Sequence, residues 1–238
     1  MTDRSPLYPD EVLSGRRQAP GGDGPVKRTG SGVAMVLDSW RRRPVPRRVI
    51  GTLSVLMLVA GVALFAWPFA TNLWSDWKQA RLADGFGSPE HRRAYITRTI
   101  EPGDALTRIA IPRLGVDAIV VQGTTLSALQ AGAGHYEHSA LPCEKGNAAI
   151  AGHRTTYGKP FADVDELEAG DRIILETPVG RCTYEVKGSP WITAPTDFGV
   201  VARKKGSLLT LTTCHPPGSA AERLIVRAEL VKSELRAA

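Results

Sequence analysis

The feature that most constrains this chain is a run of 27 residues without a charged side chain, residues 49–75. About 20 apolar residues in a helix are enough to cross the hydrocarbon core of a bilayer. Only Asp76 and Lys78 lie close beyond its far end, whereas five arginines precede it: Arg41, Arg42, Arg43, Arg47 and Arg48. Because basic residues mark the cytoplasmic end of a span, the sequence predicts one transmembrane helix over residues 49–75 with a cytoplasmic N-terminus.

A cleaved signal peptide would also begin with basic residues followed by an apolar stretch. That stretch, however, is typically about 7–15 residues long and lies close to the N-terminus. Here the run is longer, it begins only at residue 49, and no clear A-x-A cleavage site follows it. We therefore predict that the segment is retained as a membrane anchor.

The regions on either side of the anchor differ in composition. Residues 1–48 contain 6 Pro and 6 Gly without a sustained apolar period, so we expect a disordered, basic cytoplasmic tail. Residues 76–100 are polar with scattered apolar positions and are expected to form a juxtamembrane helix and stalk. Residues 101–238 remain for an extracellular domain, which would place the function of the protein outside the cell membrane.

The net charge of +6 suggests a nucleic-acid partner until its distribution is considered. Residues 1–48 hold 10 Lys and Arg against 5 Asp and Glu, which leaves 20 against 19 in the rest of the chain. A nearly neutral body lacks the basic surface that nucleic-acid binding requires. We therefore expect no nucleic-acid partner.

Beyond residue 101 the sequence consists of short β-rich runs separated by Gly and Pro. This pattern is typical of an all-β barrel or sandwich rather than of alternating βα units. Residues 171–177 and 182–186 are expected to pair as a hairpin, and residues 126–132 and 161–167 to form short helices. The clearest strand candidates are residues 105–112, 115–122, 147–153, 171–177, 181–188, 207–214 and 222–231.

Cys214 is the strongest candidate for a nucleophile. It ends the alternating segment 210–214, and a Pro-Pro-Gly sequence begins two residues later. The end of a strand can present a side chain to solvent, although a free cysteine buried in the core is the common alternative. An ordinary thiol, with a pKa of about 8.5, is mostly protonated at neutral pH, so a nucleophilic cysteine needs a neighbouring base or positive charge.

Among the five histidines, His153 is the best candidate for that base. It follows the apolar segment 148–152 and therefore lies where a strand exits into a loop. His215 is adjacent to Cys214 in sequence but should point to the opposite face of its strand. His135 and His138 have an i, i+3 spacing without a convincing third ligand, so we expect no metal site.

Arg223 is the candidate positive charge. It opens the strand candidate that follows Cys214, and antiparallel pairing would bring it back beside the cysteine. Arg227 lies on the same strand face and is the direct competitor of Arg223. A tyrosine-phosphatase loop is disfavoured, because its Cys-x5-Arg spacing is absent and two of the eight intervening residues are prolines without N–H groups.

These motifs together resemble the sortase family, and specifically its class E. The resemblance covers residues 101–232 and rests on TLTTC at 210–214, an arginine nine residues later, GHRTTYG at 152–158 and an anchor before a β domain. It implies an eight-stranded β-barrel with short helices behind one transmembrane helix. It also implies roles for individual residues: Cys214 as nucleophile, His153 as catalytic histidine, Arg223 as catalytic arginine, and Thr213, Tyr157 and His135 as substrate contacts.

The resemblance further implies a reaction and its partners. A secreted protein with a C-terminal LPxTG- or LAxTG-like sorting signal would be cleaved at Thr-Gly through a thioacyl-enzyme. An amine of lipid II or of the peptidoglycan cross-bridge would then resolve it, which joins the protein to a Gram-positive cell wall. No calcium or other cofactor is implied. A pilin polymerase or hydrolase on the same fold, or a non-catalytic extracellular β domain, remains an alternative.

Two cysteines depart from the sortase pattern. Cys143 stands where the resemblance leads us to expect glycine, and Cys182 begins a strand candidate outside the motif. We hypothesise a disulfide between them, because the extracellular side is oxidising and the bridge would enclose His153. Two free buried thiols are the alternative, since a bridge requires Cα atoms within about 7 Å.

Overall fold

The computed structural model describes residues 47–235, and the chain divides into the units 1–55 and 56–238. The described part of the first unit is helical. It begins α2 (Arg47–Gly85), a helix of 39 residues whose most apolar window has a mean hydropathy of 2.5 with none of that window buried. This helix is long and apolar enough to cross a membrane. The tail predicted for residues 1–48 lies outside the described residues, except that Arg47 and Arg48 already belong to α2.

Helix α2 continues through residue 75, where the sequence predicted the anchor to end. The predicted juxtamembrane helix consists of the last turns of α2 and a separate helix, α3 (Pro89–Thr97). Ser88 caps α3, since its hydroxyl accepts a hydrogen bond from the backbone N–H of His91. The segment predicted as an anchor and the start of the predicted juxtamembrane helix therefore form one continuous helix.

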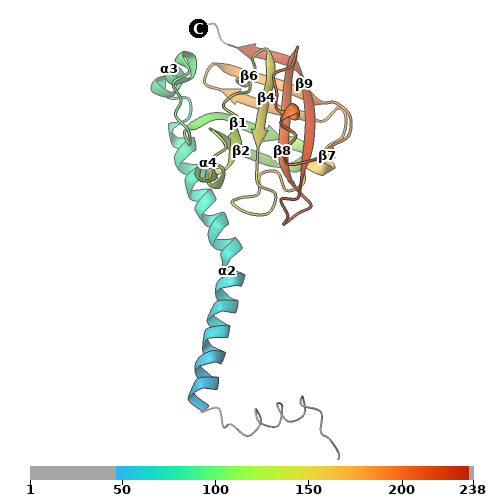
Figure 1. Cartoon of the computed structure of the whole chain (residues 1–238). Helices are drawn as coiled ribbons and strands as arrows, with labels where there is room; N and C mark the ends of the chain where they lie inside the picture. The colour runs from blue at the N-terminus through green and yellow to red at the C-terminus, as the bar shows by residue number, and fades with distance from the viewer. Residues whose placement is uncertain (1–46, 236–238) are drawn as a thin grey trace, which may run out of the picture. The chain divides into compact units, whose positions relative to one another are not determined.

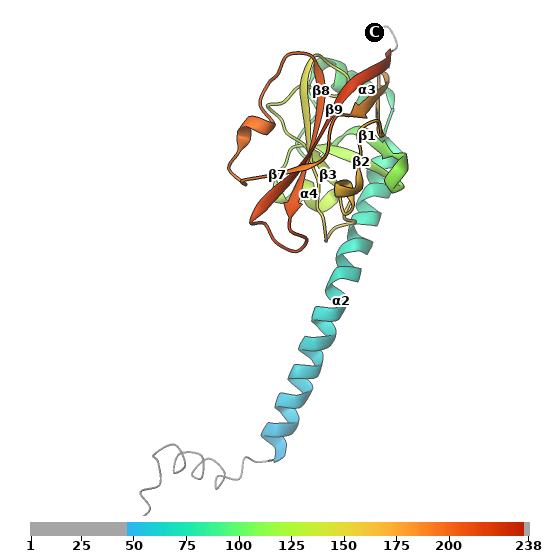
Figure 2. The ribbon, with the colours of Figure 1, turned by 90° about the vertical axis from the view of Figure 1, so that its right-hand side faces the viewer.

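The remainder of the chain is an eight-stranded closed β-barrel, as the sequence resemblance predicted (Figures 1 and 2). Pairing of the last strand with β6 closes the ring. Around the barrel the strands follow in the order β6 (Gly180–Val186), β5 (Arg172–Thr177), β1 (Ala105–Ile111), β2 (Val116–Gln122), β3 (Ala133–His135), β4 (Gly146–Ala151), β8 (Ser207–His215) and β9 (Glu222–Leu235).

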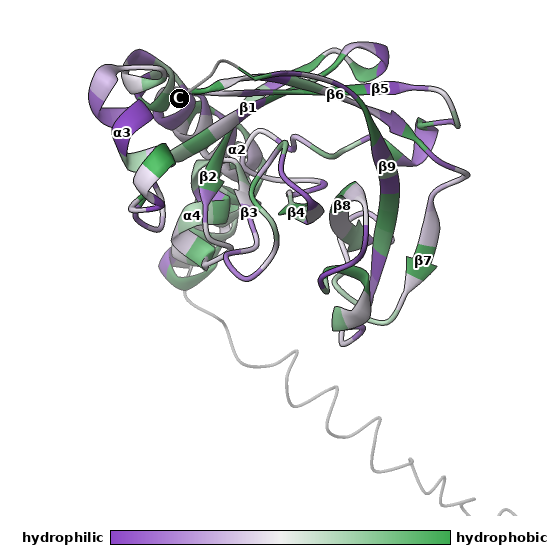
Figure 3. Ribbon diagram, turned by 90° about the horizontal axis from the view of Figure 1, so that it is seen from above, coloured by the Kyte–Doolittle hydropathy of each residue, from purple (hydrophilic) through white to green (hydrophobic). Residues whose placement is uncertain are grey.

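Strand β9 closes the barrel because it is long enough for two partners. Its first half pairs with β8, and its second half, from Ala228 onward, pairs with β6. A ninth strand, β7 (Trp191–Thr193), pairs with the start of β9 on the edge away from β8, as the view in Figure 3 shows. The strands β3 and β7, of three residues each, were not predicted from the sequence.

The pairing of β4 with β8 determines where the site forms. The two strands are parallel and in register from Gly146 opposite Ser207 to Ala151 opposite Thr212. Residues that leave the two strands at their C-terminal ends therefore emerge side by side. Alternation along both strands sends every second side chain into the barrel, with Ile150 and Leu211 fully buried in its core.

The shorter elements agree in part with the sequence. The predicted hairpin is present as β5–β6, with Thr177 opposite Gly180, so its second strand begins two residues before the predicted Cys182. The predicted helix 126–132 is α4 (Leu126–Ala131), capped by Thr125. The predicted helix 161–167 is only the single turn η2 (Val164–Glu166). Two other single turns, η1 (Pro112–Leu114) and η3 (Phe198–Val200), complete the fold.

A disulfide joins Cys143 to Cys182, with their Cα atoms 5.7 Å apart. Both cysteines are buried among the apolar side chains of the barrel core. The bridge connects the loop before β4 to strand β6 across a sequence separation of 39 residues, and β4 and His153 lie within this interval. The hypothesised pairing is therefore present, and the alternative of two free buried thiols is not.

Candidate active site

Cys214 is the next-to-last residue of β8 and the only cysteine outside the disulfide. It is half-buried, and its direct cross-strand partner on β9 is Arg223. Leu211, three residues before Cys214, and Leu224, next to Arg223, belong to the core, so alternation directs the side chains of Cys214 and Arg223 to the outer face of the barrel. The predicted return of Arg223 to Cys214 is therefore observed in the register.

His153 emerges beside Cys214 from the neighbouring strand β4. The ladder of β4 and β8 ends at Ala151 and Thr212, and two hydrogen bonds extend it: Gly152 N donates to Thr212 O at 3.0 Å, and Thr213 Oγ1 donates to Gly152 O at 2.8 Å. One further step along both chains reaches His153 and Cys214. Because Ile150 points into the core, His153 has the parity of the outer face.

The surroundings of His153 favour a neutral imidazole. Burial lowers the pKa of His153, since removal of water disfavours the charged form. The ring lies against that of Tyr157, with 5.3 Å between the centroids. Among the described residues, no hydrogen-bond partner reaches the buried Nε2 atom. No described protein group therefore occupies this nitrogen.

The competition between Arg223 and Arg227 is decided by register. Arg227 lies opposite Thr210, four residues along β9 from Arg223, which corresponds to about 13 Å in an extended strand. Its Nη2 atom donates to Val200 O at 3.0 Å, and its guanidinium lies over the Trp191 ring. Arg227 thus fastens the segment 198–202 to the barrel, whereas Arg223 is the guanidinium beside Cys214.

The guanidinium of Arg223 is partly engaged. Nη1 donates to the carbonyl oxygens of Ala220 and Glu222, at 3.1 and 3.0 Å. Both carbonyls belong to the connection between β8 and β9 and hold the arginine close to its own strand. Within the described residues, Nε and Nη2 of Arg223 have no hydrogen-bond partner, so they remain available for another acceptor.

The three predicted substrate contacts lie in different environments. Thr213 is buried, and its hydroxyl bonds to Gly152 O, so this side chain holds the exits of β4 and β8 together. Tyr157 lies beside His153, and its hydroxyl accepts a hydrogen bond from Gln130 Nε2 at 3.2 Å. Thr213 therefore stabilises the strand ends that carry the site, and Tyr157 borders the site through its ring.

His135 lies in the interior instead. Its side chain is fully buried, with Nε2 2.8 Å from Ala140 O and Nδ1 3.0 Å from Gln122 Oε1. Burial lowers the pKa of His135 to about 4. An imidazole whose two nitrogens both have protein partners offers no atom to a peptide at the surface, so this placement does not support the predicted substrate contact.

A cavity of about 570 Å³ has one wall residue, Tyr136, that contacts β8. It lies between the loop after β3 and the segment 198–202, and its walls include Tyr136, Phe198 and Val201. The Tyr136 hydroxyl is 3.2 Å from Thr212 Oγ1, and Thr212 shares its strand face with Cys214. The Phe198 side chain is 70% exposed and stands at this groove. An extended peptide with apolar side chains fits such a surface.

Arg154 is a buried residue of the site that the sequence did not reveal. Its side chain is only 5% exposed and forms an ion pair with Asp165 at 2.6 Å. It also donates to Ala162 O and to His215 Nδ1, both at 3.0 Å. In sequence Arg154 follows His153, and a polar loop offers no signal that an arginine will be buried.

Other parts of the described chain are less suited to chemistry. A larger cavity, of about 680 Å³, is lined by five cationic side chains, but it lies at the start of β4 and β8, opposite the end that carries Cys214. Within residues 47–235, no three His, Cys, Asp or Glu side chains converge into a group that could hold a metal ion. The outer face at the ends of β4, β8 and β9 is therefore the candidate site.

Comparison with known proteins identifies similar chains. A family model described as "Sortase domain" matches residues 109–231. Sortase SrtE1 of Streptomyces coelicolor is 30% identical over 182 residues, which cover 70% of this chain but only 48% of that relative. A sortase D5 transpeptidase of Clostridium perfringens superposes with a TM-score of 0.58 at 30% identity, over 66% of this chain and 98% of the other. Sortase E of Streptomyces avermitilis superposes with a TM-score of 0.52 at 38% identity, over 57% and 93%.

Proposed function

Because this chain belongs to the sortase family and most resembles its class E, we propose that it is a membrane-anchored cysteine transpeptidase. Its donor substrate would be a secreted protein with an LPxTG- or LAxTG-like sorting signal, and its acceptor an amine of lipid II or of the peptidoglycan cross-bridge. The observation that carries the proposal is the order β4–β8–β9, with Cys214 on the central strand between His153 and Arg223 on one outer face.

In the first step the sulfur of Cys214 attacks the carbonyl carbon of the threonine in the signal. A thioester forms, the Thr-Gly bond breaks, and His153 delivers a proton to the departing glycine amine. The free Nε2 of His153 supports this role, since that nitrogen can take the thiol proton and return it to the leaving group. His215 is less suited, because its Nδ1 is occupied by Arg154.

Arg223 would stabilise the negative oxygen of the tetrahedral intermediate. Its register opposite Cys214 supports this role. Among the described residues, only Nη1 of Arg223 donates to carbonyls of the β8–β9 connection, so its other N–H groups can face the oxyanion. A planar guanidinium presents its donors in a fixed geometry, which suits an oxyanion formed at a defined point. Arg223 would also orient the peptide carbonyl before attack.

The groove beside Tyr136 and Phe198 would hold the apolar residues of the signal. Its wall residue Tyr136 contacts Thr212, which shares its strand face with Cys214, and its apolar wall residues match the leucine and the proline or alanine that begin such a signal. Exposed aromatic side chains are common in surfaces that bind extended peptides, because they bury a large area at low entropic cost. Tyr157, beside His153, would close the opposite side of the site.

In the second step an acceptor amine attacks the thioester while His153 removes its proton, which forms the new amide and frees Cys214. The membrane helix supports an acceptor located at the membrane surface. Tethering enzyme and acceptor to one surface raises their effective concentration. We place the N-terminus in the cytoplasm on the strength of the five arginines before the helix.

The test uses the full-length protein in detergent with LPxTG and LAxTG reporter peptides, each with and without a glycine or diaminopimelate nucleophile. We expect release of the glycine-side fragment, an amine adduct on the threonine side, and loss of both in Cys214→Ala. Fragment release without an adduct would favour a hydrolase over a transpeptidase. Absence of cleavage for both peptides would refute the proposal.

A further inference from the structure

The buried guanidinium of Arg154 links three separate segments of the chain. Nη2 pairs with Asp165 on η2, Nε donates to Ala162 O in the loop after His153, and Nη1 donates to His215 Nδ1 at the end of β8. A buried arginine is costly unless its charge and its N–H groups have partners. All three guanidinium nitrogens of Arg154 have such a partner, so the side chain connects these segments inside the protein and is not a solvated surface charge.

The contact with His215 fixes the chemical state of that imidazole. A guanidinium can only donate hydrogen bonds, so Nδ1 of His215 must accept, and its ring proton must sit on Nε2. A charged imidazolium would offer no lone pair and would repel the guanidinium. His215 is therefore neutral while this bond exists, which makes it an acceptor for Arg154 and not the proton donor of the reaction.

Arg154 and His215 each follow the candidate catalytic residue by one position. Alternation along β8 turns His215 away from the face of Cys214, and Arg154 reaches it from the bend that follows β4. Beyond the last ladder pair, two other hydrogen bonds join the exits of β4 and β8 among the described residues: Gly152 N donates to Thr212 O, and the Thr213 hydroxyl donates to Gly152 O. The bond between Arg154 and His215 extends this connection past both candidate catalytic residues.

We propose that Arg154 is a positioning residue that fixes the histidine loop to the cysteine strand through His215. The expected effect on catalysis rests on the proposed function. The expected effect on the structure of the loop rests on the contacts alone. The same guanidinium holds Ala162 O, and Phe161 N donates to His153 O at 3.1 Å, so the loop 153–162 is closed at both ends. Release of the His215 contact would loosen one end and let the imidazole of His153 move relative to the sulfur.

The test compares two substitutions of His215, which is only half-buried, in the full-length protein. His215→Leu removes the acceptor, whereas His215→Gln restores an acceptor oxygen. We expect His215→Leu to lower kcat about tenfold with an unchanged KM, because small displacements of a catalytic group cost rate and not ground-state binding. His215→Gln should regain most of this loss. Arg113→Met, which removes an exposed arginine ion pair elsewhere, is the matched control and should leave kcat unchanged.

A substrate-free measurement separates this inference from the proposed function. Hydrogen exchange of the amides in residues 153–162 should accelerate in His215→Leu and in Arg154→Met, and not in His215→Gln or Arg113→Met. If the wild-type protein cleaves neither peptide, the proposed function fails while hydrogen exchange still decides the link. Unchanged exchange in His215→Leu, or equal losses of kcat in the Leu and Gln variants, would overturn the positioning role.

Discussion

The disulfide between Cys143 and Cys182 makes a quantitative prediction about the stability of the barrel. Replacing both cysteines by alanine opens a loop with a sequence separation of 39 residues. In the chain-entropy treatment, the lost constraint on the unfolded chain amounts to about 4 kcal/mol at 25 °C for a loop of this size. This is a large fraction of the 5–15 kcal/mol by which domains are typically stable. The barrel should still fold, because alanine fills part of the buried volume, but with a small margin.

The measurement is a urea titration of the full-length protein in a mild detergent, with a protease pulse at each concentration and the surviving barrel quantified on a gel. The midpoint should fall by about 1–3 M, given a urea dependence of roughly 1.5–3 kcal/mol per molar for a domain of this size. The wild-type protein in reductant should shift similarly. The single variant Cys143→Ala also lacks the bridge but keeps the Cys182 side chain. Its difference from the double variant therefore measures the loss of that second side chain alone.

Two results would contradict this reasoning. Alkylation of the unreduced, unfolded wild-type protein should modify Cys214 alone, so modification of three thiols would show that no bridge exists. A loss of less than about 1 kcal/mol in the double variant would mean that the unfolded chain is not constrained as the entropy treatment requires. Once the protein is folded, turnover should be unchanged, since the bridge lies in the core and not at the outer face of β8.

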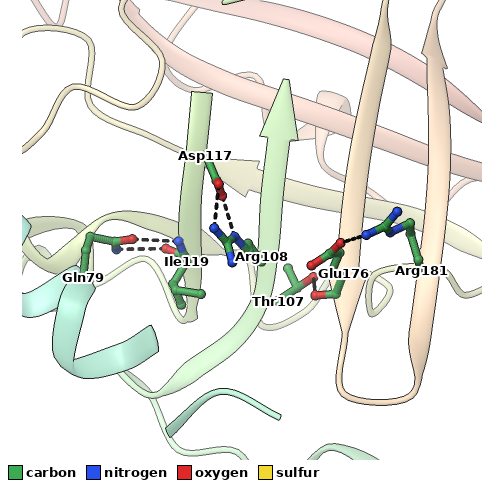
Figure 4. A network of polar contacts seen from close by, with 7 residues as sticks. All are labelled: Gln79, Thr107, Arg108, Asp117, Ile119, Glu176 and Arg181. Carbon is green, nitrogen blue, oxygen red and sulfur yellow. Dashed lines mark hydrogen bonds and ion pairs between the residues drawn. The ribbon is translucent and has the colours of Figure 1, made fainter. Parts of the chain in front are cut away.

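Three further predictions concern the remaining polar side chains. Burial lowers the pKa of His135 to about 4, so as the pH falls from 6.5 to 4 only the unfolded chain gains a proton on this residue. The free energy of unfolding, measured by urea titration at each pH, should therefore fall by about 3 kcal/mol over this range. The fall should be smaller in His135→Gln. Gln79 on α2 donates to Ile119 O and accepts from Ile119 N (Figure 4), and it also donates to Ala131 O. Gln79→Ala should accelerate amide exchange at Ile119 more than Gln79→Glu, which retains the acceptor, and equal rates would contradict the contact. Arg223→Lys should lower kcat about a hundredfold, whereas Arg227→Lys should mainly destabilise the segment 198–202; similar kinetic losses in both variants would remove the distinction drawn from register.

The sequence was sufficient wherever the signal is local. The uncharged run 49–75 predicts a membrane-spanning helix from length and composition alone, and α2 contains it. The pairing of Arg223 with Cys214 could be predicted because a short connection between two strands permits little else than an antiparallel return. The residue at which α2 ends could not be predicted, since nothing in the helical propensity of residues 76–85 distinguishes a stalk from a continued helix.

The long-range features needed either the resemblance or the structure. No periodicity in β4 or β8 shows that these strands pair in parallel, so residue patterns alone made His153 a candidate without placing it beside Cys214. Strands β3 and β7 are too short to show alternation. The burial of His135 and of Arg154 could not be predicted for one reason: a polar side chain gives no sign in the sequence of whether its partners lie in solvent or in the protein interior.

The two pairings that assemble the site differ in how they depend on folding. Cys214 and Arg223 belong to one local hairpin, whereas His153 reaches Cys214 only through the β4–β8 ladder, between strands far apart in sequence. Contacts of large sequence separation form only after the chain has closed the intervening loop. We therefore expect Cys214 to pair with Arg223 early in folding and to meet His153 only when the barrel has formed. Under the proposed mechanism, a partly folded chain would carry Cys214 without its base, so acyl transfer would require the finished barrel.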